Sequence, residues 1–360
     1  MNTVIIERKD RTLSATVHLP FSKSISNRLL MMKAISGKKF LLKNISDADD
    51  TKLLQKLILS NNKVLDAQNA GTCYRFLTAY LSQKAGEWTL TGSDRMKARP
   101  IGALVDALRK LGADIKYLEK ENFPPLLIKG KKLMGGELTI DASQSSQFIS
   151  ALLLIAPSIE GGMKLNTSGE VSSMPYVEMT MRLMEHFGIK ITGNKNSIEI
   201  PQQEYITKEY LVERDWSSAA FWFGLAAMSD SSEIFLEGLT EESIQGDSIV
   251  MYLMKNFGVE TKFTTDGAGI SLLKKASQKK CEFNFSQCPD LAPVFFVLCS
   301  ALGVEATFYG VKNLAIKESN RAEAIKTELE KCGAEILKRS DDEYFVRPHP
   351  LAPSPKGEGE

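Results

Sequence analysis

The sequence predicts an α/β protein that is built from repeated βαβ-like units in two domains, and two observations support this prediction. A chain of 360 residues is too long for one hydrophobic core and indicates two domains. Helices that end in glycine and lead into a strand recur at nearly regular intervals, around Gly112, Gly188, Gly258 and Gly333. Glycine in this place suits the left-handed cap that often ends a helix. Each unit can bury its apolar face only against a neighbouring unit.

Five such units are expected along the chain. Their glycine-ended helices are amphipathic, and the first copy, Asp49–Leu59, is degenerate. The clearest case has apolar residues spaced by three and four, at Val250, Leu253, Met254 and Phe257. A second helix of each unit is expected to begin near Ser24, Thr72, Ser145, Ser217 and Leu291. The strands expected after these helices are Lys39–Ile45, Glu87–Thr91, Met163–Asn166, Glu233–Leu236 and Glu305–Tyr309.

The domain boundary is expected near Leu211–Asp215, between a polar stretch and a new helix over Trp216–Met228. The fifth unit ends near Val346, and the Pro/Gly/charged segment after it is expected to be disordered. Two domains of three units each would need a sixth unit, so the odd number indicates that one is absent. The alternative is an asymmetric fold with a flexible tail.

Composition excludes several classes of function. A net charge of +1 argues against binding of nucleic acid or of a membrane surface. The five cysteines have no paired spacing and are expected to be free thiols, with Cys73, Cys299 and Cys332 buried in helices. The three histidines are scattered and predict no metal site. With no signal peptide and no membrane-spanning run in the sequence, we expect a reduced, cytoplasmic protein.

Four short segments combine hydroxyl or amide side chains with lysine or arginine, and most of them open a helix. They are Ser22–Arg28, Asn69–Arg75, Arg95–Pro100 and Lys317–Arg321. The start of a helix offers unpaired N–H groups and a partial positive charge, which suit an anion. A hydroxyl and a cation strengthen such a site. Ordinary helix capping explains any one of them, but four together predict a site for a small polyanion.

These segments, in this order, resemble the 5-enolpyruvylshikimate-3-phosphate (EPSP) synthase family, from about residue 17 to about residue 338. Further matching motifs are Ser145-Ser146-Gln147-Phe148, Ser173-x-Pro175-Tyr176 and Pro289-Asp290. The resemblance implies the enolpyruvyl transferase fold, with two inside-out α/β domains of βαβαββ repeats. The expected domains are residues 20–213 with three repeats, residues 1–19 plus 214–346 with two of three, and a disordered tail over 347–360.

The resemblance implies transfer of the enolpyruvyl group of phosphoenolpyruvate to the 5-hydroxyl of shikimate 3-phosphate, with release of phosphate and without a cofactor. This is a step in the biosynthesis of chorismate and the aromatic amino acids. Asp290 is the expected base, Glu318 the expected acid, and Lys23 the group between both substrates. The shikimate 3-phosphate ligands implied are Ser24, Arg28, Ser145, Ser146, Ser173, Asn313 and Lys317, and those of phosphoenolpyruvate are Gly71, Arg99, Gln147 and Arg321. We expect a monomer that binds small molecules and neither nucleic acid nor membranes.

The sequence departs from the family pattern at Phe21, Met174, Ala315 and Asn320. It also stops before the family's last repeat and two late cations, which predicts a weakened phosphoenolpyruvate subsite. One alternative is therefore a catalytically impaired remnant that at most binds shikimate 3-phosphate. Another is a UDP-N-acetylglucosamine enolpyruvyltransferase, which is disfavoured because that family opens with Lys-Asn. Arg75, which follows the Gly71 turn on an apolar helix, is expected to have a structural role.

Overall fold

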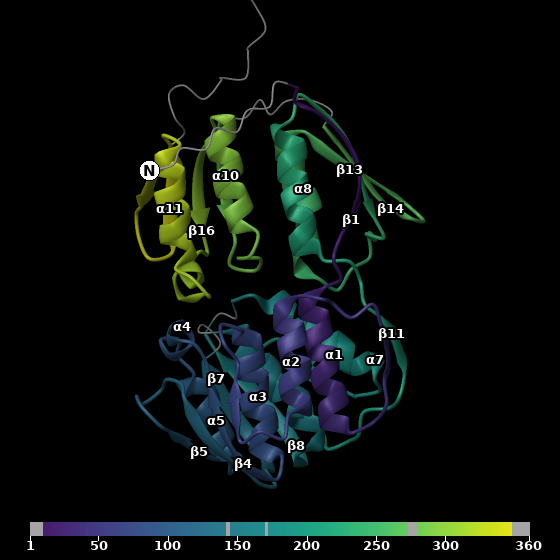
Figure 1. Ribbon diagram of the computed structural model, residues 1–360, viewed down its shortest axis with the longest axis vertical. Coiled ribbons are helices and arrows are strands. Elements are labelled where there is room, and N and C mark those ends of the chain that lie inside the picture. The colour runs from purple at the N-terminus through teal and green to yellow at the C-terminus, as the bar shows by residue number, and fades with distance from the viewer. Residues whose placement is uncertain (1–9, 142–144, 170–171, 273–278, 348–360) are drawn as a thin grey trace, which may run out of the picture.

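The computed structural model describes residues 10–141, 145–169, 172–272 and 279–347, which form two lobes, one above the other in Figure 1. The described chain crosses between the lobes twice. The two crossing segments lie side by side: Phe21 pairs with Arg214, the Ser22 N–H donates to the Glu213 carbonyl at 2.9 Å, and the Asp215 N–H donates to the Pro20 carbonyl at 2.9 Å. This double crossing places the starts of several helices at the boundary between the lobes.

The lower lobe holds three groups of helices and strands. The first contains α1 (Lys23–Ser36), β2 (Leu41–Lys43), α2 (Asp49–Leu59) and the distant β11 (Glu209–Leu211), which pairs in parallel with β2. The second contains β3 (Val64–Asp66), α3 (Gly71–Gln83), β4 (Gly86–Thr91), α4 (Asp94–Lys97), α5 (Gly102–Lys110), β5 (Asp114–Tyr117) and β6 (Leu126–Gly130). The third contains β7 (Met134–Asp141), α6 (Ser146–Ile155), the 3-10 turn η1 (Ala156–Ser158), β8 (Glu160–Ser168), α7 (Met174–His186), β9 (Thr192–Asn194) and β10 (Ser197–Ile200).

The upper lobe holds two further groups. One contains β1 (Thr12–His18), α8 (Trp216–Met228), β12 (Ser231–Glu237), η2 (Gly246–Ile249), α9 (Val250–Leu253), η3 (Met254–Phe257), β13 (Val259–Thr264) and β14 (Gly267–Leu272). The other contains β15 (Lys280–Asn284), α10 (Ala292–Leu302), β16 (Glu305–Tyr309), η4 (Lys312–Ile316), α11 (Arg321–Lys331), β17 (Glu335–Lys338) and β18 (Glu343–Arg347). The first strand, β1, pairs in parallel with β12, as the resemblance implies.

The repetition expected from the sequence is confirmed by the sheets. Four four-stranded sheets in the described part of the chain share one topology, β3-β4-β6-β5, β7-β8-β10-β9, β1-β12-β14-β13 and β15-β16-β18-β17. In each, the first two strands are parallel and the other pairs antiparallel. The glycines expected after helices, Gly112, Gly188, Gly258 and Gly333, all have positive φ. The mixed α/β fold predicted from the sequence is therefore confirmed.

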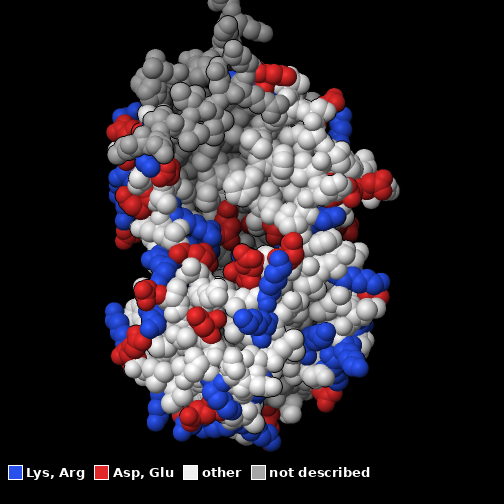
Figure 2. Space-filling model, viewed as in Figure 1, with Lys and Arg blue, Asp and Glu red and all other residues white. Residues whose placement is uncertain are grey.

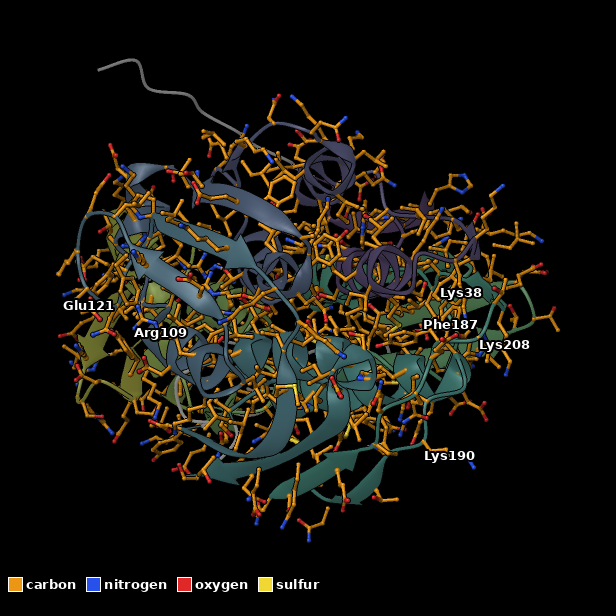
Figure 3. All side chains as sticks on the ribbon, turned by 90° about the horizontal axis from the view of Figure 1, so that it is seen from below. Lys38, Arg109, Glu121, Phe187, Lys190 and Lys208 are labelled. Carbon is orange, nitrogen blue, oxygen red and sulfur yellow. The ribbon has the colours of Figure 1, made fainter. Side chains whose placement is uncertain are left out.

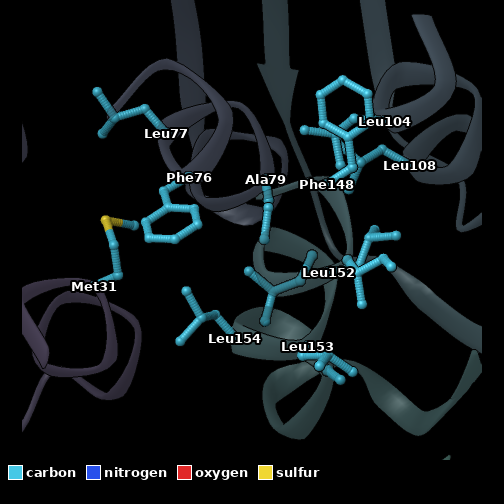
Figure 4. Packing of buried hydrophobic residues seen from close by; sticks show 14 of the residues in the cluster. Met31, Phe76, Leu77, Ala79, Leu104, Leu108, Phe148, Leu152, Leu153 and Leu154 are labelled. Carbon is cyan, nitrogen blue, oxygen red and sulfur yellow. The ribbon is translucent and has the colours of Figure 1, made fainter. Parts of the chain in front are cut away.

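Helices fill the centre of the lower lobe. The middle of α6 is buried on all sides, with Leu152, Leu153 and Leu154 at most 1% exposed, as expected of a helix without a polar face. Figure 4 shows these leucines packing with Phe76 of α3. Charged side chains such as Glu121 and Lys190 lie at the rim in Figure 3, whereas Phe187 is fully buried.

A second core in the upper lobe is formed by α8, α10, α11 and their sheets. The lower core contains described residues between Ile25 and Val212, and the upper one Leu19 together with residues from Trp216 onward. We propose these two cores as the two domains expected from the sequence. The expectation of an absent sixth unit stays a prediction.

Three local expectations are corrected. The helix expected before Gly258 is divided into the short helices η2, α9 and η3. Cys332 is exposed, since it follows α11, which turns few residues inward. Arg347, assigned to the tail, belongs to β18 and pairs with Glu335 at 2.6 Å. The rest of the predicted tail lies outside the described residues.

Candidate active site

A charged cleft separates the two lobes, and Figure 2 shows acidic and basic side chains gathered at this hollow. Two cavities of about 370 and 560 Å³ lie along it, and residues of both lobes line each of them. The smaller cavity is lined by Arg75, Arg99, Ser145, Ser146, Gln147, Ser172, Ser173, Asn313 and Lys317, among others. The larger one is lined by Lys23, Ser24, Tyr176, Asp215, Ser217, Asp290 and Arg321, among others. Most of the predicted site residues are thus brought together.

Lys23 and Ser24 reach the larger cavity because α1 begins there. The Ser22 hydroxyl caps this helix by accepting the Ile25 N–H at 3.4 Å. The Lys23 ammonium pairs with Asp50 at 3.1 Å. Burial alone would lower the pKa of Lys23, but the charge and hydrogen bond of Asp50 raise it above its ordinary value. Lys23 is therefore positively charged at neutral pH.

Asp290 lies just before α10 and is held by two cations. Its Oδ1 accepts from the Arg321 guanidinium at 2.7 Å and lies 3.4 Å from the Lys317 ammonium, while its Oδ2 accepts from the Tyr176 hydroxyl at 3.0 Å. Burial would raise the pKa of Asp290, but Lys317 and Arg321 outweigh it and hold the pKa well below its usual range. The carboxyl is therefore ionised at neutral pH, and its role as the base stays a prediction.

Glu318 bridges the two guanidiniums that the resemblance assigns to phosphoenolpyruvate. Its carboxylate lies 3.0 Å from Arg321 and 3.4 Å from Arg99 of the lower lobe. Burial would raise the pKa of Glu318, but the charge of Arg99, together with Arg321, lowers it. In this arrangement the expected acid is ionised, and the expected ligand cations are neutralised by a protein carboxylate.

Gly71 allows two guanidiniums to meet at the start of α3. A Cβ at this position would lie 2.4 Å from Nη1 of Arg99 and 2.7 Å from Nη1 of Arg75. Gln147 lies beside them and donates to the Thr72 hydroxyl at 3.2 Å. Arg75 is 4% exposed and lines the smaller cavity, whereas sequence reasoning gave it a structural role. Its place in the same segment as Gly71 was the signal that could have found it.

Serines gather at the other end of the smaller cavity. The Ser145 hydroxyl caps α6 by accepting the Gln147 N–H at 3.2 Å, which leaves Ser146 in the first turn. Ser173 has a left-handed backbone with φ of 59° at the start of α7. Ser172, which sequence reasoning missed, accepts from the Asn313 amide at 2.9 Å and so links the two lobes. Its place next to Ser173 was its signal in the sequence.

Like Gly71 and Glu318, the predicted ligand Arg28 lines neither cavity. Its guanidinium is 2% exposed and donates to the Thr180 hydroxyl at 2.7 Å and to the Ser24 and Tyr176 carbonyls at 2.9 and 3.0 Å. Burial lowers the pKa of Arg28 to about 10. In this arrangement Arg28 fixes the backbone of Ser24, and its role as a ligand stays a prediction.

The described residues contain no group of three or more His, Cys, Asp or Glu side chains that could hold a metal ion. In the same residues, no helix combines the length and the apolar character that a membrane span requires.

Together, the fold and the cleft define a two-lobed α/β protein with an interlobe site suited to small polyanions. Residues 53–351 match the family model described as EPSP synthase (3-phosphoshikimate 1-carboxyvinyltransferase). The chain is 44% identical over 331 residues to a 3-phosphoshikimate 1-carboxyvinyltransferase of Bacteroides fragilis, covering 91% of this chain and 80% of the relative. It is 36% identical over 370 residues to that of Vibrio campbellii, covering 94% and 85%. The chain belongs to the EPSP synthase family.

A solved structure has the same fold. The chain matches the EPSP synthase of Acinetobacter baumannii with a TM-score of 0.74 at 20% identity, over 94% of this chain and 82% of that one. These relatives are not UDP-N-acetylglucosamine enolpyruvyltransferases, so that alternative is not favoured.

Proposed function

We propose that this chain transfers the enolpyruvyl group of phosphoenolpyruvate to the 5-hydroxyl of shikimate 3-phosphate and releases phosphate. The observation that carries the proposal is the meeting of Lys23, Lys317 and Arg321 around the ionised Asp290, in a cleft between lobes of an EPSP synthase family member. Each substrate carries a phosphate and a carboxylate, so their mutual repulsion must be offset by cations before they can react.

In this proposal each substrate contacts residues of both cavities. Shikimate 3-phosphate places its phosphate among Ser145, Ser146 and Ser173, near Asn313 and Lys317. This orientation brings its ring toward Asp290 and Lys23 in the larger cavity. Hydroxyls at helix starts and a lysine are the donors that a phosphate monoester prefers.

Phosphoenolpyruvate binds by exchanging ion pairs. In the structure Glu318 pairs with both Arg99 and Arg321. The phosphate and carboxylate of phosphoenolpyruvate take over these guanidiniums and add negative charge beside Glu318. Both effects raise the pKa of Glu318 and favour its protonated form, which the reaction needs.

The chemistry then proceeds by addition and elimination. Asp290 removes the proton of the 5-hydroxyl while the oxygen of that hydroxyl attacks C2 of phosphoenolpyruvate. Glu318 gives its proton to the methylene C3. Lys23 stabilises the charge that passes between the two substrates. Glu318 then takes a proton back from the new methyl group while the C2–phosphate bond breaks and Asp290 gives its proton to the leaving phosphate. These steps form the enol ether of the product and return both carboxyls to their first states.

We also propose that the protein acts as a monomer in the cytoplasm. Residues of one chain line both cavities, so no second copy is needed to complete them. Cys73, Cys288, Cys299 and Cys332 are free thiols, which fits a reducing compartment.

The test is release of phosphate from phosphoenolpyruvate by the purified chain, with and without shikimate 3-phosphate. Release that requires the acceptor, and that falls by roughly 100-fold or more in Lys23→Ala and Glu318→Gln, is expected. Lys190→Ala, an exposed lysine away from the cleft, serves as the matched control and should behave as the unmodified chain. Absence of release from a folded sample would contradict the proposal.

A further inference from the structure

A buried carboxyl outside the proposed mechanism contacts the wall of the larger cavity. Asp247 is 3% exposed, and its Oδ2 lies 2.6 Å from the hydroxyl of Ser217. Its Oδ1 is buried and has no hydrogen-bond partner in the described part of the chain. Ser217 lies in the first turn of α8 and lines the larger cavity together with Asp290 and Tyr176. Ser217 therefore separates the Asp247 carboxyl from the substrate space.

The backbone around Asp247 is fixed by the crossing between the lobes. The Gln245 amide donates to the Arg214 carbonyl at 2.7 Å and its oxygen accepts the Trp216 N–H at 3.2 Å. Gly246 is packed against Pro175 of α7, so a side chain at this position would collide with it. The contacts of Gln245 with Arg214 and Trp216, and of Gly246 with Pro175, hold the backbone so that Asp247 faces Ser217.

The groups around this carboxyl are mostly acidic. Burial first, and then the charges of Asp290 and Asp215, raise the pKa of Asp247 to about 7. The Ser217 hydrogen bond and the positive charge of Lys317 lower it and so partly offset this rise. Tyr176 and Cys288 also face it, and their pKa values are raised by burial and by these carboxylates, so both are neutral. Asp247 is the group here that changes its charge near neutral pH.

We propose that Asp247 is a positioning residue whose protonation sets the direction of the Ser217 hydroxyl toward an anionic ligand. When Asp247 is neutral, its O–H donates to the Ser217 oxygen, and the Ser217 hydrogen is free to donate into the cavity. When Asp247 is ionised, Ser217 must donate to it and presents only lone pairs to the ligand. An anion therefore binds the neutral form more tightly, and binding near pH 7 takes up a proton. That the anion is shikimate 3-phosphate rests on the proposed function.

Calorimetric titration with shikimate 3-phosphate between pH 5.5 and 8.5 tests this proposal. Asp247→Asn keeps a donor toward Ser217 at every pH, so the ratio of the Kd of the unmodified chain to that of the variant should rise through pH 7. The expected rise is about tenfold, as for one hydrogen bond to a charged group. Ionisation of the ligand's own phosphate is common to both proteins and cancels in the ratio. Measured in the same way against Asp247→Asn, the Kd of Ser217→Ala should show no such rise through pH 7. The Kd of Asp266→Asn, a matched change at an exposed residue, should show the same rise as the unmodified chain. A constant ratio would overturn the proposal.

A second measurement needs no ligand and separates this proposal from the proposed function. Carbon NMR of the aspartate carboxyls should show one group that titrates near pH 7 and is missing in Asp247→Asn. Because the Ser217 hydrogen bond lowers the pKa of Asp247, Ser217→Ala should move this titration to higher pH. An unchanged midpoint of this titration in Ser217→Ala would overturn the proposed pairing of Asp247 with Ser217. Failure of every variant to bind shikimate 3-phosphate, with the titration shift present, would count against the proposed function alone.

Discussion

At the scale of single residues, the cleft is an arrangement of paired charges. Asp290 and Glu318 share Arg321, and Glu318 reaches Arg99 in the opposite lobe. Burial of a charged group is costly unless it is paired, so these carboxylates hold the cations of the cleft in place. Ligand phosphates can replace them because they offer the same oxygen acceptors with more charge.

Asp290 should make the folded protein sensitive to acid. Its pKa in the folded state lies below its ordinary value of 3.8, so the stability that it contributes is present above about pH 4 and is lost as the pH falls further. The difference in unfolding free energy between the unmodified chain and Asp290→Asn should be largest at pH 7 and should shrink between pH 4 and pH 2. Denaturant unfolding at several pH values measures it, and a difference independent of pH would contradict this expectation.

At the scale of elements, the starts of helices bring the ligand-binding groups to the cleft. Ser22, Ser145 and Asp215 each cap a helix with their side chain, and residues of the following turns line the cavities. The same local chemistry therefore starts the helix and places N–H groups and hydroxyls where an anion can contact them. This is why capping and ligand binding could not be separated in any single segment of the sequence.

Gly71→Ala should weaken binding of phosphoenolpyruvate. The new Cβ would displace the Arg99 and Arg75 guanidiniums at the start of α3, so we expect KM for phosphoenolpyruvate to rise by roughly tenfold, the equivalent of one lost contact to a charged group. The affinity for shikimate 3-phosphate should change little. Gly136→Ala in β7 is the matched control, because nothing lies within 4 Å of its added Cβ. Steady-state kinetics with each substrate varied separates the two effects.

Leu152→Ala in α6 should destabilise the lower lobe. The side chain is fully buried, so the substitution removes apolar contacts and leaves a cavity, at a cost of about 2–5 kcal/mol. Leu59→Ala in α2 makes the same chemical change at a side chain that is 81% exposed, where we expect less than about 0.5 kcal/mol. If urea unfolding shows that the two variants lose equal amounts of unfolding free energy, α6 is not the centre of the core.

At the scale of the whole molecule, the two lobes are held together by contacts across the cleft. Arg95 of α4 donates to the Ala315 carbonyl at 2.9 Å and to the Lys317 carbonyl at 2.9 and 3.1 Å. These bonds fix the backbone next to Glu318 and place it opposite Arg99. Closure of the cleft between the lobes and correct placement of Glu318 therefore depend on the same contacts.

Arg95→Ala should let the lobes separate. Each lost hydrogen bond contributes about 0.5–1.5 kcal/mol, so the open arrangement should become more populated. We expect a larger radius of gyration by small-angle X-ray scattering and a higher KM for phosphoenolpyruvate. Arg182→Ala, at an exposed arginine of α7, should leave both unchanged. A compact Arg95→Ala protein with unaltered KM would show that other contacts close the cleft.

Much of the fold could be predicted because it depends on short-range rules. Glycines with positive φ after helices, as at Gly188 and Gly258, and hydroxyl residues at helix starts are local signals of structure. The helix before Gly258 was the exception, because the structure divides it into η2, α9 and η3 although its apolar spacing is that of one helix.

The sequence by itself determined the repeated units, the places where helices begin and end, and the segments that carry the cations. Only the tertiary structure decided which of these groups meet. It turned Arg28 inward to protein partners, brought Arg75 to the cavity and set Asp247 behind Ser217. The physical reason is that helix periodicity and capping act over a few residues of the chain. Contacts between charges more than a hundred residues apart, such as Arg99 with Glu318, depend on how the two crossings bring the lobes together.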